Sequence, residues 1–368
     1  MDTKPLTAIG LMSGTSMDGV DAALLRTDGV SLVEPGPALT MPYSDAFRAR
    51  LRAILGPAAR AQSGAEQVEA DLTRLHADAV NLLLAEAGLS PADVDVIGFH
   101  GHTVHHDPAR GVTVQIGQGD VLAARVGIDV VNDLRAADVA AGGQGAPLVP
   151  VFHQALVRGA AGLETPVAVL NIGGVANVTW VGADDDELLA FDTGPGNAPL
   201  NDWVFGHTGA DCDRDGRLAA AGRVRDGVLA QLLDHPYFTR TPPKSLDRQD
   251  FSFDAVTGMS LEDGAATLTA FVAASVARSV AHFPQIPECW VVTGGGRRNP
   301  VMMEALEREL GVDVRAAESL GWDGDAMEAQ AFAYLAVRSL KGLPITFPGT
   351  TGVGEPARGG VHHRALRD

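Results

Sequence analysis

The sequence predicts an α/β chain of two domains, each with parallel pairing in part of its sheet. Apolar runs of strand length alternate with longer segments of helical period, as in α/β folds. The chain has 368 residues, more than one hydrophobic core usually serves. A strand, a glycine-rich turn and a second strand occur twice, at 8–25 and at 167–180. Glycines and prolines gather at 142–150, so we expect domains at 1–145 and 146–368, with the extreme C-terminal tail free to pack back on the first.

Charge and composition argue against several classes of partner. The chain has 28 lysines and arginines against 46 aspartates and glutamates, and its formal net charge of −18 repels nucleic acids. Its two cysteines, Cys212 and Cys289, have no paired spacing and suggest a reducing compartment. The N-terminus lacks a secretory pattern, and the uncharged stretch 264–277 is shorter than the ~20 residues of a membrane span. We expect a cytoplasmic protein with no nucleic-acid or membrane partner.

The tips of the two predicted hairpins carry groups that bind phosphate. Both are rich in glycine, which exposes backbone N–H groups. The first tip adds the hydroxyls of Ser13, Thr15 and Ser16 and the carboxylate of Asp18, which suit a phosphate and a Mg²⁺ ion. A repeated hairpin by itself is equally a structural feature, and the chemistry of the tips favours binding.

A histidine cluster occupies positions 100–106. Alternate spacing on a strand would place His100 and His102 on one face, as two Zn²⁺ ligands require. A third ligand is not evident. We therefore favour the alternative, a polar segment that lines a substrate cleft.

Asp192 follows the apolar run 188–191 and precedes a rigid Thr-Gly-Pro-Gly loop. A carboxylate at the carboxyl end of a strand lies where open α/β sheets bind ligands. An aspartate before Thr-Gly also often caps the following turn. Both interpretations stay open on the local sequence.

Two later segments combine a turn with a helix start. Residues 289–300 predict a strand, three glycines at 294–296 and a helix after Asn299, and the glycines allow backbone to approach a flat ligand. Ser260 and Asp263 predict the start of another helix. Asp325 and Glu328 have the spacing of a capping box, so Glu328 is either a structural partner of Asp325 or a functional carboxylate.

These segments together resemble a known superfamily. The sequence has no GxxxxGK[ST] motif and no GxGxxG after a strand, which argues against P-loop and Rossmann proteins. The hairpins at 10–21 and 171–177 and the glycine loop at 293–296 resemble those of the actin, sugar-kinase and Hsp70 superfamily. The resemblance implies two duplicated actin-like ATPase domains of ribonuclease H-like fold, with ATP in an interdomain cleft.

More narrowly, the chain resembles the family of anhydro-N-acetylmuramic acid kinases. The resemblance runs through five blocks, at 10–21, 99–108, 131–153, 171–177 and 191–197. The chain departs from the family pattern at His102, where the family has Gln, at Leu246-Asp247, where it has Thr-Gly, and at Thr293, where it has Cys.

The resemblance assigns the ligand contacts to specific residues. The contacts to ATP would come from Gly14, Thr15, Ser16, Met17, Asp18, Gly19, Val20, Asp21, Asn171, Gly173, Gly174, Asn177, Gly294, Gly295, Gly296 and Asn299. Asp18 is the candidate for a contact to Mg²⁺ through water. The contacts to the sugar would come from Ser13, His100, His102, Thr103, Arg135, Gly194 and Asn197. Arg135 would hold the lactyl carboxylate, and the alternative for it is an interdomain salt bridge with Asp133 or Asp138.

Members of this family open the 1,6-anhydro ring with water and phosphorylate the released O6 with ATP, in peptidoglycan recycling. Asp192 matches the position of the base that takes the proton of the water, and Glu328 would orient the water or a sugar hydroxyl. The resemblance also suggests a homodimer. A kinase for another 1,6-anhydrosugar such as levoglucosan, and a nucleotide-gated sugar sensor without catalysis, are the alternatives.

Overall fold

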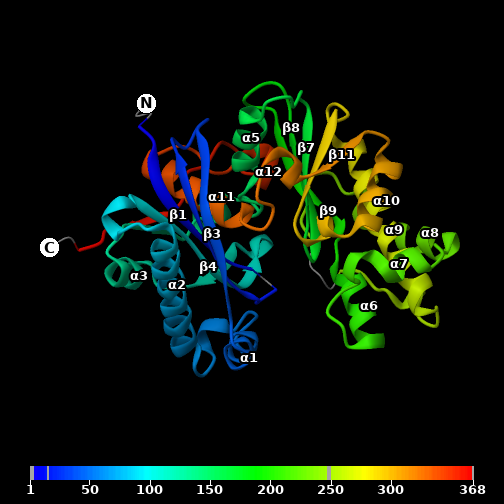
Figure 1. Ribbon diagram of the computed structural model, residues 1–368, viewed down its shortest axis with the longest axis horizontal. Helices are drawn as coiled ribbons and strands as arrows, with labels where there is room; N and C mark the ends of the chain where they lie inside the picture. The colour runs from blue at the N-terminus through cyan, green and yellow to red at the C-terminus, as the bar shows by residue number, and fades with distance from the viewer. Residues whose placement is uncertain (1–3, 15, 247–249, 367–368) are drawn as a thin grey trace. The chain divides into compact units, whose positions relative to one another are not determined.

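The structure is a computed structural model that describes residues 4–14, 16–246 and 250–366. The chain forms two compact units: unit 1 is 1–159 with 326–368, and unit 2 is 160–325 (Figure 1). This division differs from the expected boundary at 145 and 146. Residues 146–159 and the whole segment from 326 onward belong with the first sheet, because a long helix from that segment packs directly on its strands.

Unit 1 is a seven-stranded mixed sheet with helices on both faces. Its strands are β1 Leu6–Ser13, β2 Gly19–Thr27, β3 Val33–Pro42, β4 Val96–Asp107, β5 Val112–Ile116, β6 Val130–Asn132 and β12 Val361–His363. Its helices are α1 Asp45–Ala53, α2 Ala65–Ala87, α3 Gly119–Val126, α4 Ala136–Ala140, α5 Pro150–Gly159, α11 Met327–Leu340 and α12 Pro348–Thr351.

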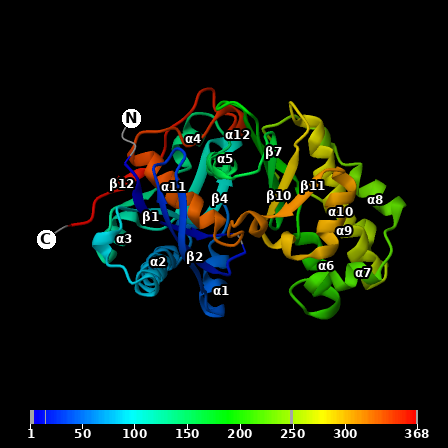
Figure 2. The same ribbon diagram turned by 45° about the horizontal axis from the view of Figure 1, so that its top comes forward.

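The predicted first hairpin is confirmed, because β1 and β2 pair antiparallel from Leu6 and Thr27 to Met12 and Asp21. Alternate residues of β1 and β4, such as Ile9 and Ile97, enter one core cluster with residues of α2. Gly10 of β1 and Gly98 of β4, which alternate with these core residues, face α11. The two helices therefore lie on opposite faces of this sheet, as Figures 1 and 2 show.

Two glycines in adjacent strands let α11 lie directly on the backbone of the sheet. Gly10 of β1 and Gly98 of β4 are paired in register. A Cβ built on Gly10 would lie 1.7 Å from the carbonyl oxygen of Ala329, and one built on Gly98 would lie 1.9 Å from that of Phe332. Real Cβ atoms do not approach a backbone oxygen so closely. Only glycine at both positions permits this packing.

Unit 2 is a five-stranded mixed sheet with its own set of helices. Its strands are β7 Val167–Ile172, β8 Val175–Val181, β9 Leu188–Pro195, β10 Cys289–Thr293 and β11 Asp313–Ala316. Its helices are α6 Ala198–Thr208, α7 Arg217–Ala221, α8 Asp226–Leu233, α9 Leu261–Ser279 and α10 Pro300–Leu310. Residues of α9 and α10 share a core cluster with the sheet, so both helices cover the same face (Figure 2).

The two sheets repeat one strand order. In unit 1 the order is β3-β2-β1-β4-β6, with β12 beyond β6, and in unit 2 it is β9-β8-β7-β10-β11. In both orders the first three strands are antiparallel neighbours, the fourth strand pairs parallel to the third, and the fifth pairs parallel to the fourth. The predicted second hairpin, β7 with β8, is therefore the counterpart of β1 with β2. The predicted α/β class with two duplicated domains is confirmed by this repeat.

Local capping signals are mostly, but not all, as predicted. Ser260 accepts a hydrogen bond from the backbone of Asp263 at the start of α9, and Asn299 accepts from Val301 and Met302 at the start of α10. The capping box predicted from Asp325 is wrong. Helix α11 begins at Met327 with Ala326 as its N-cap, and the carboxylate of Asp325 instead forms ion pairs with Arg297 and Arg298.

One helical stretch of the described residues, Leu261–His282, has the length and apolar composition of a membrane span. Most of it is buried inside the protein, and its apolar residues belong to the core clusters of unit 2.

Replacing Gly98 by Ala should destabilise unit 1 severely. The new methyl group would force α11 away from the sheet, at a cost of about 3 kcal/mol or more. Gly206→Ala is the matched control, because this glycine lies in α6 with no atom near its Cβ position, and the change should stabilise the helix by about 0.5–1 kcal/mol. Urea unfolding measures both. Equal stability of Gly98→Ala and the parent protein would contradict the packing argument.

Candidate active site

The tip of the first hairpin is a tight turn held in an unusual backbone conformation. The N–H of Met17 donates to the carbonyl of Gly14 at 3.0 Å, and Met17 has a φ of 56°, in the left-handed region that favours glycine. The side chains of Ser16 and Asp18 are exposed at this tip. Thr15 lies outside the described residues. The turn therefore presents a hydroxyl and a carboxylate at a strained, fixed point of the backbone.

The rest of this predicted contact segment is turned into the protein. The side chains of Met17 and Val20 belong to the hydrophobic core of unit 1. A Cβ on Gly19 would lie 2.3 Å from the carbonyl oxygen of Met41, and Asp21 accepts a hydrogen bond from the hydroxyl of Thr40. The side chains of Met17, Val20 and Asp21 therefore have structural partners, and the close approach of Met41 leaves no room for a side chain at Gly19.

Ser13, the last residue of β1, is joined to a buried hydrogen-bonded chain. The hydroxyl of Tyr43 donates to Ser13 Oγ at 2.8 Å, and Ser13 Oγ lies 3.0 Å from Nδ1 of His102. All three residues are buried. Burial lowers the pKa of His102 to about 4, so its imidazole is neutral. This chain of bonds fixes the hairpin at its base.

His100 is held by the guanidinium of Arg135. Nδ1 of His100 bonds to the carbonyl of Gly101 at 2.9 Å, so that nitrogen carries the proton. Nε2 then accepts from Nε and Nη2 of Arg135, at 3.1 and 2.9 Å. Burial and the nearby guanidinium lower the pKa of His100 well below its usual value.

Arg135 also donates to the carbonyl of Gly145 at 2.7 Å. Asp138, the salt-bridge partner considered above, accepts from the N–H of Gly145 and from the hydroxyl of Thr351, while its charge and that of Glu328 act on Arg135 from nearby. Burial lowers the pKa of Arg135 to about 10, so it remains charged at neutral pH. Glu328 lies in the first turn of α11, on the same unit.

The metal hypothesis for the histidines has no support in the structure. His100 contacts Phe332 and Arg135, whereas His102 contacts Ser13, and Gly101 between them has a φ of 69° that breaks the strand alternation. Across the described residues, no three His, Cys, Asp or Glu side chains are placed to hold a metal ion. Thr103, the residue after His102, accepts from Gln115 of β5.

In unit 2, three polar residues from three strands lie in one row. Asn171 of β7 pairs with Asn177 of β8, and Asn177 pairs with Asp192 of β9. Directly paired residues point to the same face with Cβ atoms about 4.5–5.5 Å apart. Each of the three is half-buried in a sheet that is otherwise mostly apolar. The sheet thus brings together polar residues that the sequence separates.

Glycine-rich loops border this row. The N–H groups of Gly196 and Asn197 donate to the carbonyls of Gly174 and Gly173, which ties the tip of the second hairpin to the loop after β9. The Asn197 side chain donates to the carbonyl of Ile172. Gly194, also predicted to contact ligand, is buried against Ser275 of α9. Asn299 caps α10, so its side chain has a structural partner.

The glycines of these loops fall into two groups. A Cβ built on Gly196 would lie 2.4 Å from the carbonyl oxygen of Gly173. One built on Gly294 would lie 2.3 Å from Asn171 Oδ1, and one built on Gly296 would lie 2.5 Å from Ile172 Cβ. We call these three the packed glycines. At Gly14, Gly173, Gly174 and Gly295 the nearest atom is 3.6–3.9 Å away, and none of these four has a positive φ in the left-handed region. We call these four the open glycines. Among the described residues, no contact or backbone conformation requires a glycine at these four positions, as expected where a ligand approaches the backbone.

Asp192 lies inside β9, the edge strand of the sheet, and it does not cap the turn that follows. Its carboxylate accepts from the backbone N–H of Leu246 at 2.8 Å, and its backbone carbonyl accepts from the hydroxyl of Tyr237 at 2.6 Å. Burial raises the pKa of Asp192 to about 7, and the bond from Leu246 opposes this shift. A carboxyl group with this pKa is a stronger proton acceptor than an ordinary aspartate and is partly ionised at neutral pH.

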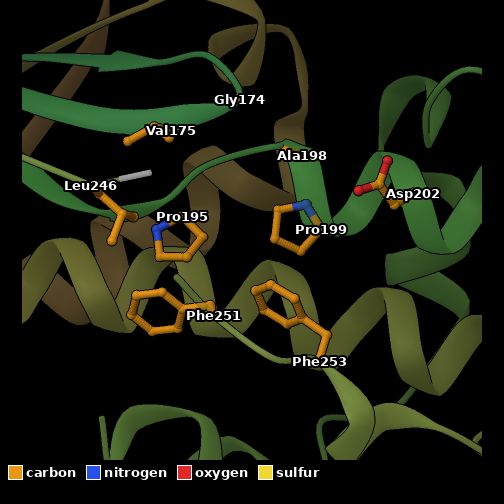
Figure 3. Close-up of a pocket in the computed structure, with 9 residues that line it drawn as sticks. All are labelled: Gly174, Val175, Pro195, Ala198, Pro199, Asp202, Leu246, Phe251 and Phe253. Carbon is orange, nitrogen blue, oxygen red and sulfur yellow. The ribbon is translucent and has the colours of Figure 1, made fainter. Parts of the chain in front are cut away.

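A pocket of about 410 Å³ opens beside these groups in unit 2 (Figure 3). The rings of Phe251 and Phe253 face Pro195 and Pro199, with Gly174 and Val175 on the opposite side and Asp202 at one end (Figure 3). Leu246, whose N–H binds Asp192, also lines it. An apolar pocket of this size with few polar groups is typical of small-molecule sites.

Several residues of the site had no sequence signal that identified them. Tyr43 and Tyr237 are buried tyrosines whose hydroxyls reach Ser13 and Asp192, and Lys244 and Leu246 supply backbone groups around Asp192. The nearest signal was Lys244 in the block that departs from the family pattern. Asp247 and Arg248 of that block lie outside the described residues.

Two units with one strand order, each with a glycine-edged hairpin, define a duplicated α/β protein of the actin-like class. The family model for anhydro-N-acetylmuramic acid kinase matches residues 6–364. A protein of that name from Paramagnetospirillum magneticum is 57% identical over 97% of this chain and 99% of its own length. One from Rhodospirillum rubrum is 56% identical over 96% of this chain and 93% of its own. The chain belongs to the anhydro-N-acetylmuramic acid kinase family.

One solved structure that matches this chain has a low sequence identity to it. The activator of the 2-hydroxyisocaproyl-CoA dehydratase from Clostridium difficile, with bound ADPNP, covers 92% of this chain and 96% of its own. It is 12% identical, with a TM-score of 0.45.

Asp192→Asn should stabilise the protein at pH 8. The folded pKa of about 7 lies above the unfolded value, so the protonated form is favoured in the fold and stability is lost as pH rises towards 7. The amide keeps an acceptor for Leu246 and never ionises. We expect a gain of on the order of 1–2 kcal/mol at pH 8, after allowance for partial exposure, and a smaller gain at pH 5.

Urea unfolding of both proteins at the two pH values measures this difference. Asp186→Asn is the control, since Asp186 is exposed in the turn before β9 and loses the same charge. A gain that does not depend on pH would show that Asp192 is not desolvated in the folded state.

Proposed function

We propose that the protein is an ATP-dependent kinase that hydrolytically opens the 1,6-anhydro ring of anhydro-N-acetylmuramic acid and phosphorylates O6. The products are N-acetylmuramic acid 6-phosphate and ADP, in peptidoglycan recycling. The observation that carries the proposal is the desolvated carboxylate of Asp192, in a row with Asn171 and Asn177 and beside open glycines, in a chain of this family.

Asp192 is the base in this reaction. Water is a poor nucleophile towards the anomeric carbon, so its proton must be taken as the C–O bond forms. The bond between C1 and O6 breaks at the same stage, and attack opposite the bridge inverts C1. The proton passes to the carboxylate of Asp192, whose raised pKa suits it to hold that proton at neutral pH.

The released O6 attacks the γ-phosphorus of ATP, and the bond to the ADP oxygen breaks. The phosphoryl group thus takes the place of the general acid of an ordinary glycosidase, and a second catalytic acid is not needed. Phosphoryl transfer depends on positioning and on neutralising charge. The backbone N–H groups of Gly14, Gly173 and Gly174 can supply both, because the open glycines leave room for phosphate oxygens to approach.

The adenosine side of ATP would lie along the loop 294–296 after β10, where Gly295 is open and Gly294 and Gly296 pack on β7. Asp18 would hold Mg²⁺ through water, because its exposed carboxylate at the first hairpin tip is an oxygen ligand of the kind that Mg²⁺ prefers. When bound, the ion would neutralise charge on the phosphate oxygens.

In unit 1, Glu328 and Arg135 are the candidates for contacts to the sugar. Arg135 is oriented by His100 and by the carbonyl of Gly145, which leaves its charge fixed for a carboxylate. Glu328 lies in the first turn of α11 and its charge acts on Arg135, which supports a role in orienting the water or a hydroxyl. The family resemblance further supports a cytoplasmic homodimer.

The purified protein should release ADP from Mg·ATP only when anhydro-N-acetylmuramic acid is present. A coupled assay with that sugar, with levoglucosan and with no sugar tests this. Asp192→Asn should lose about 10²–10⁴-fold in turnover, the usual effect of a missing general base. Asp186→Asn should keep it. Turnover with levoglucosan alone would show that the substrate is a different 1,6-anhydrosugar. No response to either sugar would favour the alternative of a nucleotide-gated sugar sensor without catalysis.

Gly174→Ala should weaken ATP binding without loss of stability. Its Cβ meets no protein atom closer than 3.7 Å, so the added methyl would collide only with a ligand. We expect about a tenfold higher Kd for ATP, or ~1.4 kcal/mol. Gly296→Ala is the comparison, since its Cβ would lie 2.5 Å from Ile172, and it should unfold more readily instead. Calorimetric titration and thermal unfolding separate the two effects. Unchanged ATP affinity in Gly174→Ala would contradict the assignment of the second hairpin.

A further inference from the structure

We propose that Lys244 is a positioning residue for Asp192, which it serves by anchoring the segment 237–246 along the edge strand β9. The inference rests on the proposed function in one respect only, that Asp192 is the base. Lys244 itself touches neither the carboxylate nor any reacting atom.

Three hydrogen bonds join Asp192 to this segment. The backbone N–H of Asp192 donates to the carbonyl of Lys244 at 3.1 Å, and its backbone carbonyl accepts from the hydroxyl of Tyr237 at 2.6 Å. Its side chain accepts from the N–H of Leu246 at 2.8 Å. Because β9 is at the edge of the sheet, β8 holds it from one side only. The segment supplies the restraint on the other side.

The side chain of Lys244 locks the segment onto itself and onto the helix side of the sheet. Its Nζ donates to the carbonyl of Tyr237 at 3.3 Å and lies 3.2 Å from Nε2 of His282, after α9. The ammonium also lies 4.8 Å from the centre of the Tyr237 ring and 5.5 Å from that of Phe191. The ammonium of Lys244 thus links the two ends of the segment, Tyr237 and Lys244, to Phe191, the neighbour of Asp192 in β9.

A purely structural anchor would not need a charge here. Lys244 is buried, and the partners that the described residues give its ammonium are neutral: a carbonyl, an imidazole and two ring faces. Burying a cation among neutral groups destabilises the folded state through loss of hydration, and an apolar side chain of the same length would fill the space without that loss. Burial and the charge of Arg240 accordingly lower the pKa of Lys244 to about 8. The directional bonds of the ammonium are what the charge provides.

The charged and titratable groups around this arrangement are few. Arg240 lies 5.6 Å from the centre of the Tyr237 ring, and Asp250 acts on Tyr237 electrostatically. The pKa of His282 is lowered by burial and by Lys244, so its imidazole is neutral, and because an ammonium can only donate, Nε2 is the acceptor of their hydrogen bond. The hydrogen bond from Leu246 is the contact that lowers the pKa of Asp192.

The test is the pH dependence of Lys244→Met, which keeps the side-chain length and removes the ammonium. Without the anchor, the N–H of Leu246 leaves the carboxylate of Asp192, so the pKa of that carboxyl rises. The acid limb of the pH profile, where kcat falls as Asp192 is protonated, should then move up from about 7 by roughly one pH unit. Turnover should fall about fivefold at pH 7, and the deficit should shrink to about twofold at pH 8, with KM for ATP unchanged. Tyr237→Phe, which removes one of the three bonds and keeps the ring, should shift the limb in the same direction.

Thr239→Val is the matched control, because Thr239 lies in the same turn and its hydroxyl bonds only to the carbonyl of Pro236 among the described groups. It should leave the limb in place. An unshifted limb in Lys244→Met, with a lower melting temperature alone, would overturn the proposal and make Lys244 a structural residue. If Lys244→Met does not fold, Tyr237→Phe decides by the same measurement.

Failure of the proposed function gives a different result. If the parent protein shows no sugar-dependent turnover, a ¹³C NMR titration of the Asp192 carboxyl, assigned with Asp192→Asn, replaces the kinetic limb. An upward shift in Lys244→Met would support the positioning role without catalysis. An unchanged titration would overturn it.

Discussion

The contact between α11 and the backbone of β1 and β4 is the constraint on which the arrangement of unit 1 depends. With Gly10 and Gly98 side by side in the sheet, the helix lies closer than any side chain would allow. This fixes the first turn of α11, with Glu328, relative to the ends of both strands. Ser13 and the hairpin tip lie at the end of β1, and His100 and His102 lie within β4, where His102 is paired with Ser13. This close approach between backbones therefore helps to position Ser13, the two histidines and Glu328, whereas Arg135 is tied to His100 by hydrogen bonds.

In unit 2 the constraint is different, because Asp192, the group proposed as the base, is costly to the fold. A carboxylate that must accept a proton at neutral pH has to be partly removed from water, and this removal destabilises the ionised form. Asp192 lies on the edge strand, where one side of the backbone is open and another segment can be placed against it. The segment 237–246 supplies one N–H to the carboxylate and no positive charge within bonding distance among the described residues. An arginine at that place would have stabilised the ionised form and made a weaker base.

The sequence predicts those features that are encoded locally. Both hairpins follow from alternating apolar residues around glycine turns, and the starts of α9 and α10 follow from Ser260 and Asn299, whose partners are two or three residues away. The prediction for Asp325 fails because two arginines from an earlier segment compete for its carboxylate. The bonds from Tyr237 and Leu246 reach Asp192 across 45 and 54 residues. No local pattern contains such pairings, so the surroundings of Asp192, which together set its pKa, were not predictable from the sequence.

The glycines show why counting a residue type in a motif is not sufficient. Seven glycines of the candidate loops look equivalent in the sequence, yet the packed ones are explained by the contacts of the protein with itself. The open ones are explained by neither contact nor backbone conformation, and each glycine adds to the conformational entropy that is lost on folding. A fold that keeps glycine at such positions gives up stability for access to its backbone. The open glycines lie on both hairpin tips and on the loop after β10. The two tips are equivalent in the duplicated strand order, and β10 is the neighbour of β7, which leads into the second tip. A triphosphate requires access to the backbone at these elements. A sugar, which is bound mainly by side chains, does not require it.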